Sequence, residues 1–242
     1  MVKGDFILLP HPRELTFAGT ECDLLRPRTN RGVSGERRRF IRLGSGDAEP
    51  MLRIGRAVKK AVELVSEVDL ELTAGDNDAA VIVEVDPNLV IEPEGYELNI
   101  LRNQIRLVSR DAAGAFYGAQ TLLQIARQYQ YCGRLPCLRV RDWPDLAHRG
   151  VQLDISRRRI PTMESLKLLV DRLAHLKINQ FQLYTEHTFA YHNHAAVWEG
   201  YSPMTGEQIL ELDEYCRNRF IELVPSQNTF GHMERWLHRS QY

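Results

Sequence analysis

The sequence has almost no net charge and few cysteines. Lysine and arginine total 31, aspartate and glutamate total 32, and the formal net charge is -1. No global field draws the chain to nucleic acid or to an anionic membrane, so we expect neither as a partner. The 4 cysteines are too few for a disulfide framework, and Cys132 and Cys137 lack the spacing of a CxxC site. Free thiols in a reducing compartment are the expected state.

Long apolar runs are also missing. The run from Phe6 to Pro10 is too short for the hydrophobic region of a signal peptide, and no stretch approaches the roughly 20 residues of a transmembrane helix. We therefore expect a cytoplasmic protein with no membrane contact. Residues 26–42 are rich in arginine, but Phe40 is the only aromatic residue among them. That pattern favours a solvated loop and strand face over a nucleic-acid site.

The first part of the chain mixes helices and strands without strict alternation. Helical spacing of apolar residues predicts amphipathic helices over residues 51–68 and 111–129. Strands are predicted over residues 79–85, 96–101, 104–108 and 138–141. Gly114 and Gly118 lie four residues apart in the second helix, where they lower helix propensity but allow close packing on a sheet. Residues 1–145 are therefore predicted to form an α+β domain.

In residues 146–242 the predicted strands and helices alternate. The segment HRGVQLDIS at 148–156 reads as a buried strand, and strands also fit residues 180–185 and 220–225. Thr162 can cap the helix after the first strand, and Thr205-Gly-Glu-Gln208 fits a capping box that opens the next helix. A third helix is predicted to start near Met233. Such alternation is the pattern of βα units around a parallel sheet or barrel.

Polar residues stand where these three strands end. Ser156 and Arg157 follow the first strand, Glu186 and His187 the second, and Asn228 and His232 the third. In βα barrels the chemistry lies on loops after the carboxyl ends of the strands. This set is therefore expected to hydrogen-bond a polyol. Arg149 is a further candidate site residue, but it lies at the amino end of the first strand and not after a carboxyl end.

Two other classes of function fit parts of the sequence. A metal-dependent hydrolase could use His187, His192, His194 and His232, because clustered neutral imidazoles bind zinc. No HExxH motif is present and no supporting carboxylate is evident, so a metal is not expected. The second alternative is a non-catalytic carbohydrate-binding or protein-interaction module in which the α+β domain is the binding part.

Several stretches carry a resemblance to a known family. HRGVQLDISRRRIPTMESLKLLVDRLAHLKINQFQLY resembles the start of the catalytic barrel of glycoside hydrolase family 20, the β-N-acetylhexosaminidases. EGYELNILRNQIRLVSRDAAGAFYGAQTLLQI resembles the end of the α+β domain that precedes that barrel. VPSQNTFGHMERWL and EHTFAY are similar to the hexosaminidase D-like branch. The implied fold is an α+β domain at 1–145 followed, at 146–242, by the first three βα units of a TIM (β/α)8 barrel, truncated.

The resemblance implies retaining hydrolysis of a terminal N-acetylhexosamine from a glycan or glycoconjugate. The acetamido oxygen of the substrate is the nucleophile in this reaction, and no cofactor is needed. Arg149 is implied to bind sugar hydroxyls, whereas the structural alternative is an ion pair with Asp145 or Asp154. His232 is implied to support the catalytic acid, with Glu186 as its acidic partner.

The catalytic Asp-Glu pair of the family follows barrel strand four, and three strands are predicted up to Tyr242. The only Asp-Glu dipeptide, Asp213-Glu214, lies inside the helix that starts after Thr205. We therefore expect supporting residues but no catalytic residue in this chain, and no hydrolase activity from it alone. It is expected to be a fragment of a longer enzyme or a truncated product.

Three parallel strands without further neighbours leave an open sheet edge and helix faces without partners. Such surfaces favour self-association or partial disorder. Amide hydrogen exchange is therefore expected to be slower in residues 1–145 than in residues 149–242. Equal protection of the two parts would contradict this expectation.

Overall fold

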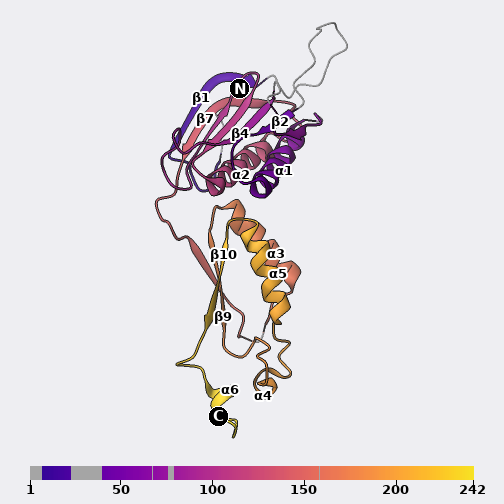
Figure 1. The fold of residues 1–242 in the computed structure, drawn as a ribbon, viewed down its shortest axis with the longest axis vertical. Coiled ribbons are helices and arrows are strands. Elements are labelled where there is room, and N and C mark those ends of the chain that lie inside the picture. The colour runs from indigo at the N-terminus through magenta and orange to yellow at the C-terminus, as the bar shows by residue number, and fades with distance from the viewer. Residues whose placement is uncertain (1–6, 23–39, 67, 76–78, 158) are drawn as a thin grey trace. The chain divides into compact units, whose positions relative to one another are not determined.

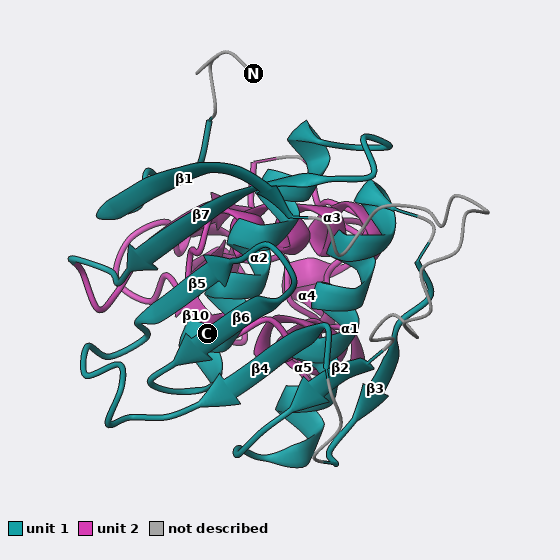
Figure 2. Ribbon diagram, turned by 90° about the horizontal axis from the view of Figure 1, so that it is seen from above, with its two compact units in different colours: residues 1–145 teal, residues 146–242 magenta. Residues whose placement is uncertain are grey.

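The computed structural model describes residues 7–22, 40–66, 68–75, 79–157 and 159–242. Most of the arginine-rich stretch 26–42 therefore lies outside the described residues. The chain divides into two compact units, Met1–Asp145 and Leu146–Tyr242, coloured teal and magenta in Figure 2. Among the described residues, no helix is long and apolar enough to cross a membrane.

Unit 1 is built on one mixed sheet of seven strands, in the order β1-β7-β5-β6-β4-β2-β3, with both helices against one face (Figures 1 and 2). The strands are β1 (Glu14–Cys22), β2 (Phe40–Leu43), β3 (Glu71–Thr73), β4 (Val81–Val85), β5 (Tyr96–Ile100), β6 (Ile105–Ser109) and β7 (Leu135–Asp142), and the helices are α1 (Ala48–Val65) and α2 (Ala112–Gln128). Strands β2, β3, β4 and β6 pair in parallel, whereas β5 and β7 pair antiparallel with their neighbours. The predicted α+β arrangement is confirmed.

Two glycines let α2 lie close to the sheet. A Cβ atom on Gly114 would overlap the carbonyl oxygen of Gly95, and one on Gly118 would overlap the side chains of Leu107 and Tyr96. The loss of helix propensity at these positions is therefore offset by contact between backbone and sheet. Close packing, as predicted from the sequence, is the reason for both glycines.

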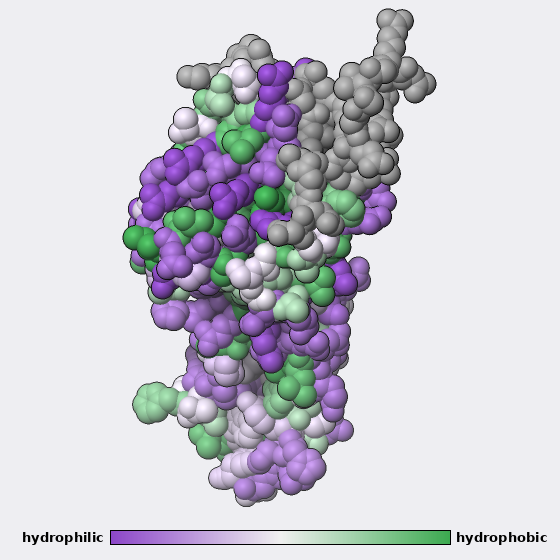
Figure 3. Space-filling model, turned by 45° about the horizontal axis from the view of Figure 1, so that its top comes forward, coloured by the Kyte–Doolittle hydropathy of each residue, from purple (hydrophilic) through white to green (hydrophobic). Residues whose placement is uncertain are grey.

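The opposite face of this sheet carries charged side chains in pairs. Arg139 binds Glu97 at 2.6 Å, and Arg106 lies 3.3 Å from Glu84. Figure 3 shows hydrophilic residues over much of the described surface, with apolar residues between them. Because exposed ion pairs are each worth little, these pairs keep the open face soluble more than they stabilise it.

Unit 2 contains a parallel sheet of three strands in the order β10-β9-β8. The strands are β8 (Gly150–Asp154), β9 (Gln180–Thr185) and β10 (Glu222–Gln227), and the helices are α3 (Met163–His175), α4 (Ala195–Trp198), α5 (Gly206–Arg217) and α6 (Glu234–Leu237). Helices α3 and α5 pack together and lie on one side of the sheet (Figure 1). The central strand β9 buries Phe181 and Leu183. The predicted βα units are therefore present. The prediction that the first of these strands is buried is wrong, because β8 lies at an edge of the sheet and four of its five residues are exposed.

Both long helices of unit 2 begin at the caps predicted from the sequence. Thr162 Oγ1 accepts a hydrogen bond from the Ser165 N–H at 3.2 Å. Thr205 Oγ1 accepts from the Gln208 N–H at 3.3 Å, and Gln208 Oε1 accepts from the Thr205 N–H at 3.0 Å. These bonds use N–H groups that a helix leaves without an internal partner, so they fix where each helix starts.

The face of this sheet away from α3 and α5 is polar. Gln152 of β8 and Gln182 of β9 are direct neighbours in the register. Nearer the amino ends, Gln180 donates to Glu222 Oε2 at 2.8 Å. Because side chains alternate along a strand, these residues lie on the side opposite Phe181 and Leu183.

Gly118→Ala tests the close packing of α2. The added methyl has no room against Leu107 and Tyr96, so the substitution is expected to destabilise the chain by about 1–3 kcal/mol despite alanine's better helix propensity. Urea denaturation of both proteins measures the difference. Gly206→Ala is the control, because a Cβ there meets nothing within 4 Å; equal stabilities of the Gly118 and Gly206 variants would contradict the packing argument.

Candidate functional site

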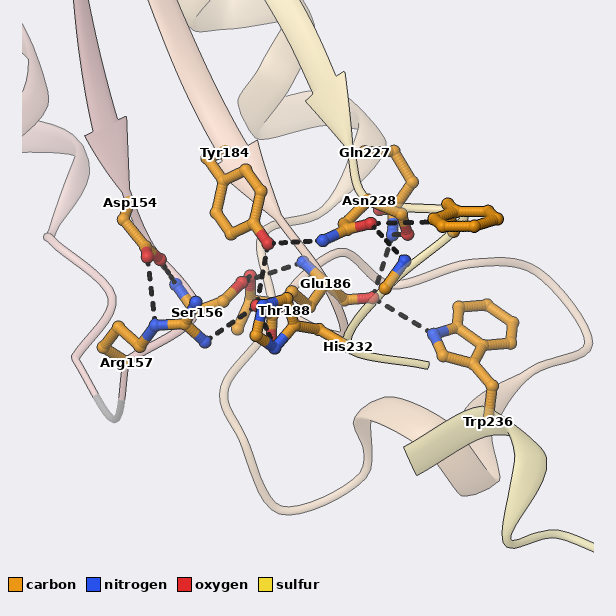
Figure 4. A network of polar contacts seen from close by, with 12 residues as sticks. Asp154, Ser156, Arg157, Tyr184, Glu186, Thr188, Gln227, Asn228, His232 and Trp236 are labelled. Carbon is orange, nitrogen blue, oxygen red and sulfur yellow. Dashed lines mark hydrogen bonds and ion pairs between the residues drawn. The ribbon is translucent and has the colours of Figure 1, made fainter. Parts of the chain in front are cut away.

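Three loops meet at the carboxyl edge of the unit 2 sheet. Asp154 pairs with Tyr184, and Tyr184 pairs with Ser226, so the ends of β8, β9 and β10 lie level. The residues that follow each strand therefore come close together, as Figure 4 shows. This is the edge at which the sequence predicted polyol-binding residues.

Glu186 is at the centre of a polar network at this edge. Its Oε1 atom accepts hydrogen bonds from Arg157 Nη1 at 2.7 Å and from the Tyr184 hydroxyl at 2.9 Å. His232 Nδ1 lies 3.8 Å from the same oxygen. The side chain of Glu186 is only 9% exposed. A carboxylate so far withdrawn from water depends on partners such as these.

The backbone of Glu186 is held as firmly as its side chain. Its N–H donates to Ser156 Oγ at 2.9 Å. Its carbonyl oxygen accepts from Gln227 Nε2 at 3.0 Å and from the indole N–H of Trp236 at 3.1 Å. The loop after β8, the last residue of β10 and helix α6 therefore fix the position of the residue after β9.

Opposing effects set the pKa of Glu186. Burial raises this pKa, but the hydrogen bonds from Tyr184 and Arg157 and the charge of Arg157 outweigh burial and lower the pKa below its ordinary value of 4.5. The hydrogen bond to Glu186 raises the pKa of Arg157 in turn. Glu186 and Arg157 are therefore an ion pair at neutral pH.

Arg157 also reaches a second carboxylate. Its Nε atom lies 3.1 Å from Asp154 Oδ2, and its side chain is 55% exposed. Asp154 Oδ1 accepts the N–H of Ser156 at 2.8 Å, and Ser156 Oγ lies 3.0 Å from Thr188 Oγ1. The guanidinium is thus held between two acids while much of it faces solvent.

Asn228 shapes the loop after β10. Its Oδ1 atom accepts the N–H groups of Phe230 at 3.3 Å and Gly231 at 3.0 Å. Its Nδ2 atom donates to the Tyr184 hydroxyl at 2.8 Å. The same loop ends at His232, whose backbone φ of 53° is in the left-handed region. The structure thus brings Asn228, His232 and Glu186, all predicted from the sequence, into one network.

His187 lies apart from this network although it follows Glu186 directly. Its ring is only 4% exposed and packs edge-on against Tyr201, with centroids 4.7 Å apart. Burial, and then the charge of Arg235, lower the pKa of His187 below 6.5. With Thr188, Tyr201 and Ser202 it lines an open hollow of about 470 Å³. His187 is thus a neutral, packed histidine.

Arg149 lies at the opposite end of β8 from Glu186. Its Nε donates to the carbonyl oxygen of Lys177 at 2.9 Å, and its Nη1 donates to the carbonyl oxygen of Leu146 at 2.7 Å. Through these bonds the guanidinium ties together backbone at the amino edge of the sheet.

Further residues of the network were missed from the sequence, among them Tyr184, Gln227 and Trp236. Tyr184 is inside β9, whereas the site residues predicted from the sequence follow the strands. Gln227 accepts from the hydroxyl groups of Thr185 at 2.9 Å and Tyr191 at 2.5 Å, besides holding Glu186. Trp236 belongs to the short α6. The alternation of side chains along β9 would have placed Tyr184 on the polar face, but no local signal indicated Trp236.

The histidines considered as zinc ligands do not form a metal site. Within the described part of the chain, no group of three or more histidine, cysteine, aspartate or glutamate side chains could hold a metal ion. His194 stacks on Tyr242 with centroids 5.5 Å apart, while His187 packs on Tyr201. The geometry therefore does not favour a metal-dependent hydrolase.

Both units match known domains of one family. The domain described as "Glycosyl hydrolase family 20, domain 2" matches residues 41–143, and "Glycosyl hydrolase family 20, catalytic domain" matches residues 146–241. The mixed sheet with two helices corresponds to the first of these domains, and the parallel βα units correspond to the beginning of the second. The chain therefore belongs to glycoside hydrolase family 20, the family of the β-hexosaminidases.

Individual relatives agree with this assignment. A beta-hexosaminidase of Porphyromonas gingivalis is 26% identical in an alignment of 210 residues that covers 76% of this chain and 27% of that protein. The beta-hexosaminidase subunit alpha of Mus musculus is 30% identical over 161 residues, covering 62% of this chain and 30% of that protein. The chain thus spans less than a third of the length of these curated relatives.

Solved structures show the same fold. The beta-N-acetylhexosaminidase of Bacteroides fragilis has a TM-score of 0.75 at 21% identity, covering 96% of this chain and 47% of that one. The N-acetyl-beta-hexosaminidase of Streptomyces plicatus, in complex with Thio-NAglucal, has a TM-score of 0.74 at 22% identity, covering 94% and 47%. The match confirms the α+β domain followed by the beginning of the catalytic barrel.

The lowered pKa of Glu186 gives a pH-dependent contribution to stability. A carboxyl whose pKa is lower in the folded state stabilises the fold above its unfolded pKa, and this contribution disappears as the pH falls through the folded value. Glu186→Gln is therefore expected to be less stable than the wild type at neutral pH, by an amount that shrinks below pH 4.5. Denaturant unfolding at several pH values measures the difference, and a difference independent of pH would contradict the ionised pair.

Proposed function

We propose that this chain is part of a glycosidase that removes terminal N-acetylhexosamine by substrate-assisted retaining hydrolysis. The observation that carries the proposal is the Glu186–His232 pair at the carboxyl edge of the barrel strands, with Arg157 bound to Glu186. In barrels of this kind, that edge holds the chemistry. Since the chain spans less than a third of its curated relatives, the proposal concerns the whole protein.

Arg157 takes the role of the arginine that binds the sugar hydroxyls. The family resemblance implied this role for Arg149, but the side chain of Arg149 bonds to backbone at the amino edge. Arg157 is at the carboxyl edge and is held between Asp154 and Glu186. A guanidinium has five N–H donors in a fixed plane, and the contacts to these acids use two of them. The remaining donors suit the hydroxyl groups of a sugar.

Glu186 and His232 support the acid that protonates the leaving group. An ionised carboxylate near Nδ1 favours the tautomer with the proton on that nitrogen, which leaves Nε2 as the acceptor for another side chain. The resemblance implies that this side chain belongs to an Asp-Glu pair after strand four. Asp213 and Glu214 do not fill that place, because they lie in α5, where Asp213 pairs with Arg217. The chain alone is therefore expected to be inactive.

The substrate is a glycan or glycoconjugate that ends in N-acetylhexosamine. One similar solved structure, an exo beta-N-acetylglucosaminidase of Vibrio harveyi, contains N-acetylglucosamine. The segments VPSQNTFGHMERWL and EHTFAY support the hexosaminidase D-like branch within the family. The reaction requires no cofactor, since the substrate supplies the nucleophile.

Hydrolysis of an aryl N-acetyl-β-glucosaminide by the full-length protein tests the proposal. Arg157→Lys is expected to lower kcat/KM about 10- to 100-fold, because lysine cannot reproduce the planar fork of donors. Arg149→Lys is the matched control and is expected to keep most of the activity of the folded enzyme. A larger loss for the Arg149 variant would reverse the assignment of the two arginines.

Inactivity of the wild-type full-length protein on aryl N-acetyl-β-hexosaminides would overturn the proposed reaction. In that case, saturable binding of N-acetylglucosamine without turnover would favour the non-catalytic carbohydrate-binding module instead. The 242-residue chain measured beside it is expected to show no turnover.

A further inference from the structure

We propose that Tyr184 and Asn228 form a relay that positions Glu186 opposite His232. Asn228 donates to the Tyr184 hydroxyl at 2.8 Å, and this hydroxyl donates to Glu186 Oε1 at 2.9 Å. Both residues act through Glu186, and neither is assigned a contact with substrate. The catalytic role of this relay rests on the proposed function. Its hydrogen bonds are tested separately, without measuring turnover.

The loop after β10 fixes which way the Asn228 amide points. Its Oδ1 atom accepts two backbone N–H groups, those of Phe230 and Gly231. Turning the amide over would place its NH2 group against these donors and leave them unpaired, so the amide nitrogen must face Tyr184. The direction of the first hydrogen bond of the relay is therefore set by the backbone of the loop.

The direction of the second bond follows from the chemistry of a phenol. A tyrosine hydroxyl has one proton, and it accepts a hydrogen bond through a lone pair. Because Tyr184 accepts from Asn228, its own proton is available for Glu186 Oε1. The register of β9 places Tyr184 beside Asp154 and Ser226, at the level where the three strands end. The hydroxyl is thus held between two loops.

One loop serves both partners of the proposed acid-supporting pair. Asn228 begins the segment that ends at His232, and its own N–H donates to the carbonyl oxygen of Thr185 at 3.0 Å. The backbone of His232 is in the strained left-handed region, so the turn before it has to be held by hydrogen bonds such as those to Asn228 Oδ1. Asn228 therefore orients Glu186 through Tyr184 and, through the turn, the segment that carries His232.

Among the described residues, Arg157, Tyr184 and His232 bring charged or titratable groups to Oε1 of Glu186. Arg157 and Tyr184 donate to Oε1, and His232 lies beyond hydrogen-bonding distance at 3.8 Å. With the Tyr184 hydroxyl removed, Arg157 is the only remaining donor to Oε1 among the described contacts. The carboxylate would then be free to turn toward Arg157 and away from His232. The relay thus keeps the oxygen facing His232 while it accepts a hydrogen bond from Arg157.

Two substitutions separate the parts of the relay. Tyr184→Phe removes the hydroxyl. Asn228→Asp keeps an oxygen for the N–H groups of Phe230 and Gly231 but replaces the amide donor with a carboxylate, which competes with Glu186 for the tyrosine proton. Tyr215→Phe is the control, because the Tyr215 hydroxyl bonds to Asp171 and does not take part in the relay.

The titration of the Glu186 carboxyl, followed by carbon-13 NMR in the 242-residue chain, is the first measurement. Loss of the tyrosine hydrogen bond is expected to move this titration to higher pH in both relay variants and not in the Tyr215 variant. A titration of Glu186 that stays at the wild-type pH in the folded Tyr184 and Asn228 variants would overturn the relay. If Tyr184→Phe fails to fold, Asn228→Asp alone decides.

The full-length enzyme provides the second measurement. Both relay variants are expected to lower kcat by about tenfold, with little change in KM, because the relay acts on the acid-supporting pair rather than on the sugar. A change confined to KM would overturn the positioning role. An inactive wild type would count against the proposed reaction, and the NMR titration would still decide the relay.

Discussion

The candidate site depends on the parallel pairing of β8, β9 and β10. Because the three strands run in one direction and end level, their following loops supply Arg157, Glu186 and His232 to one edge. A slip of one residue in β9 would exchange the two faces of the strand and turn Tyr184 away from the loops. The buried side chains of Phe181 and Leu183 prevent that slip, since it would move them to the polar face. Packing on one face therefore fixes the chemistry at the edge.

Much of the fold could be predicted from the sequence because its signals are local. Helix caps at Thr162 and Thr205 depend on residues three positions apart, and β9 occupies residues 180–185 as predicted. The first three strands were missed for a physical reason. Strand β1 is largely exposed and shows no alternation of burial, and β2 and β3 are only 4 and 3 residues long. Their pairing is decided by neighbours distant in sequence.

The site was predicted in part. Position after a strand was enough to select Glu186, Asn228 and His232, because parallel strands bring such positions together. It could not show that His187 turns aside to pack against Tyr201, since adjacent residues leave a strand in different directions. The sequence alone also could not distinguish the roles of the two arginines. Arg149 and Arg157 stand at opposite ends of one strand, and only the structure shows which guanidinium lies near Glu186 and which binds backbone carbonyls.

The neighbouring amides of Gln152 and Gln182 on the uncovered face of the unit 2 sheet bear on the engineering of chimeric barrels. An interior of aliphatic side chains accepts any partner of suitable volume. Amides are more selective, because each donor or acceptor left unpaired on burial costs about 1–3 kcal/mol. Strands grafted from another protein to complete the barrel would need polar side chains at the positions that face these two amides. Half-barrel exchange would therefore be limited here by hydrogen-bond matching rather than by shape.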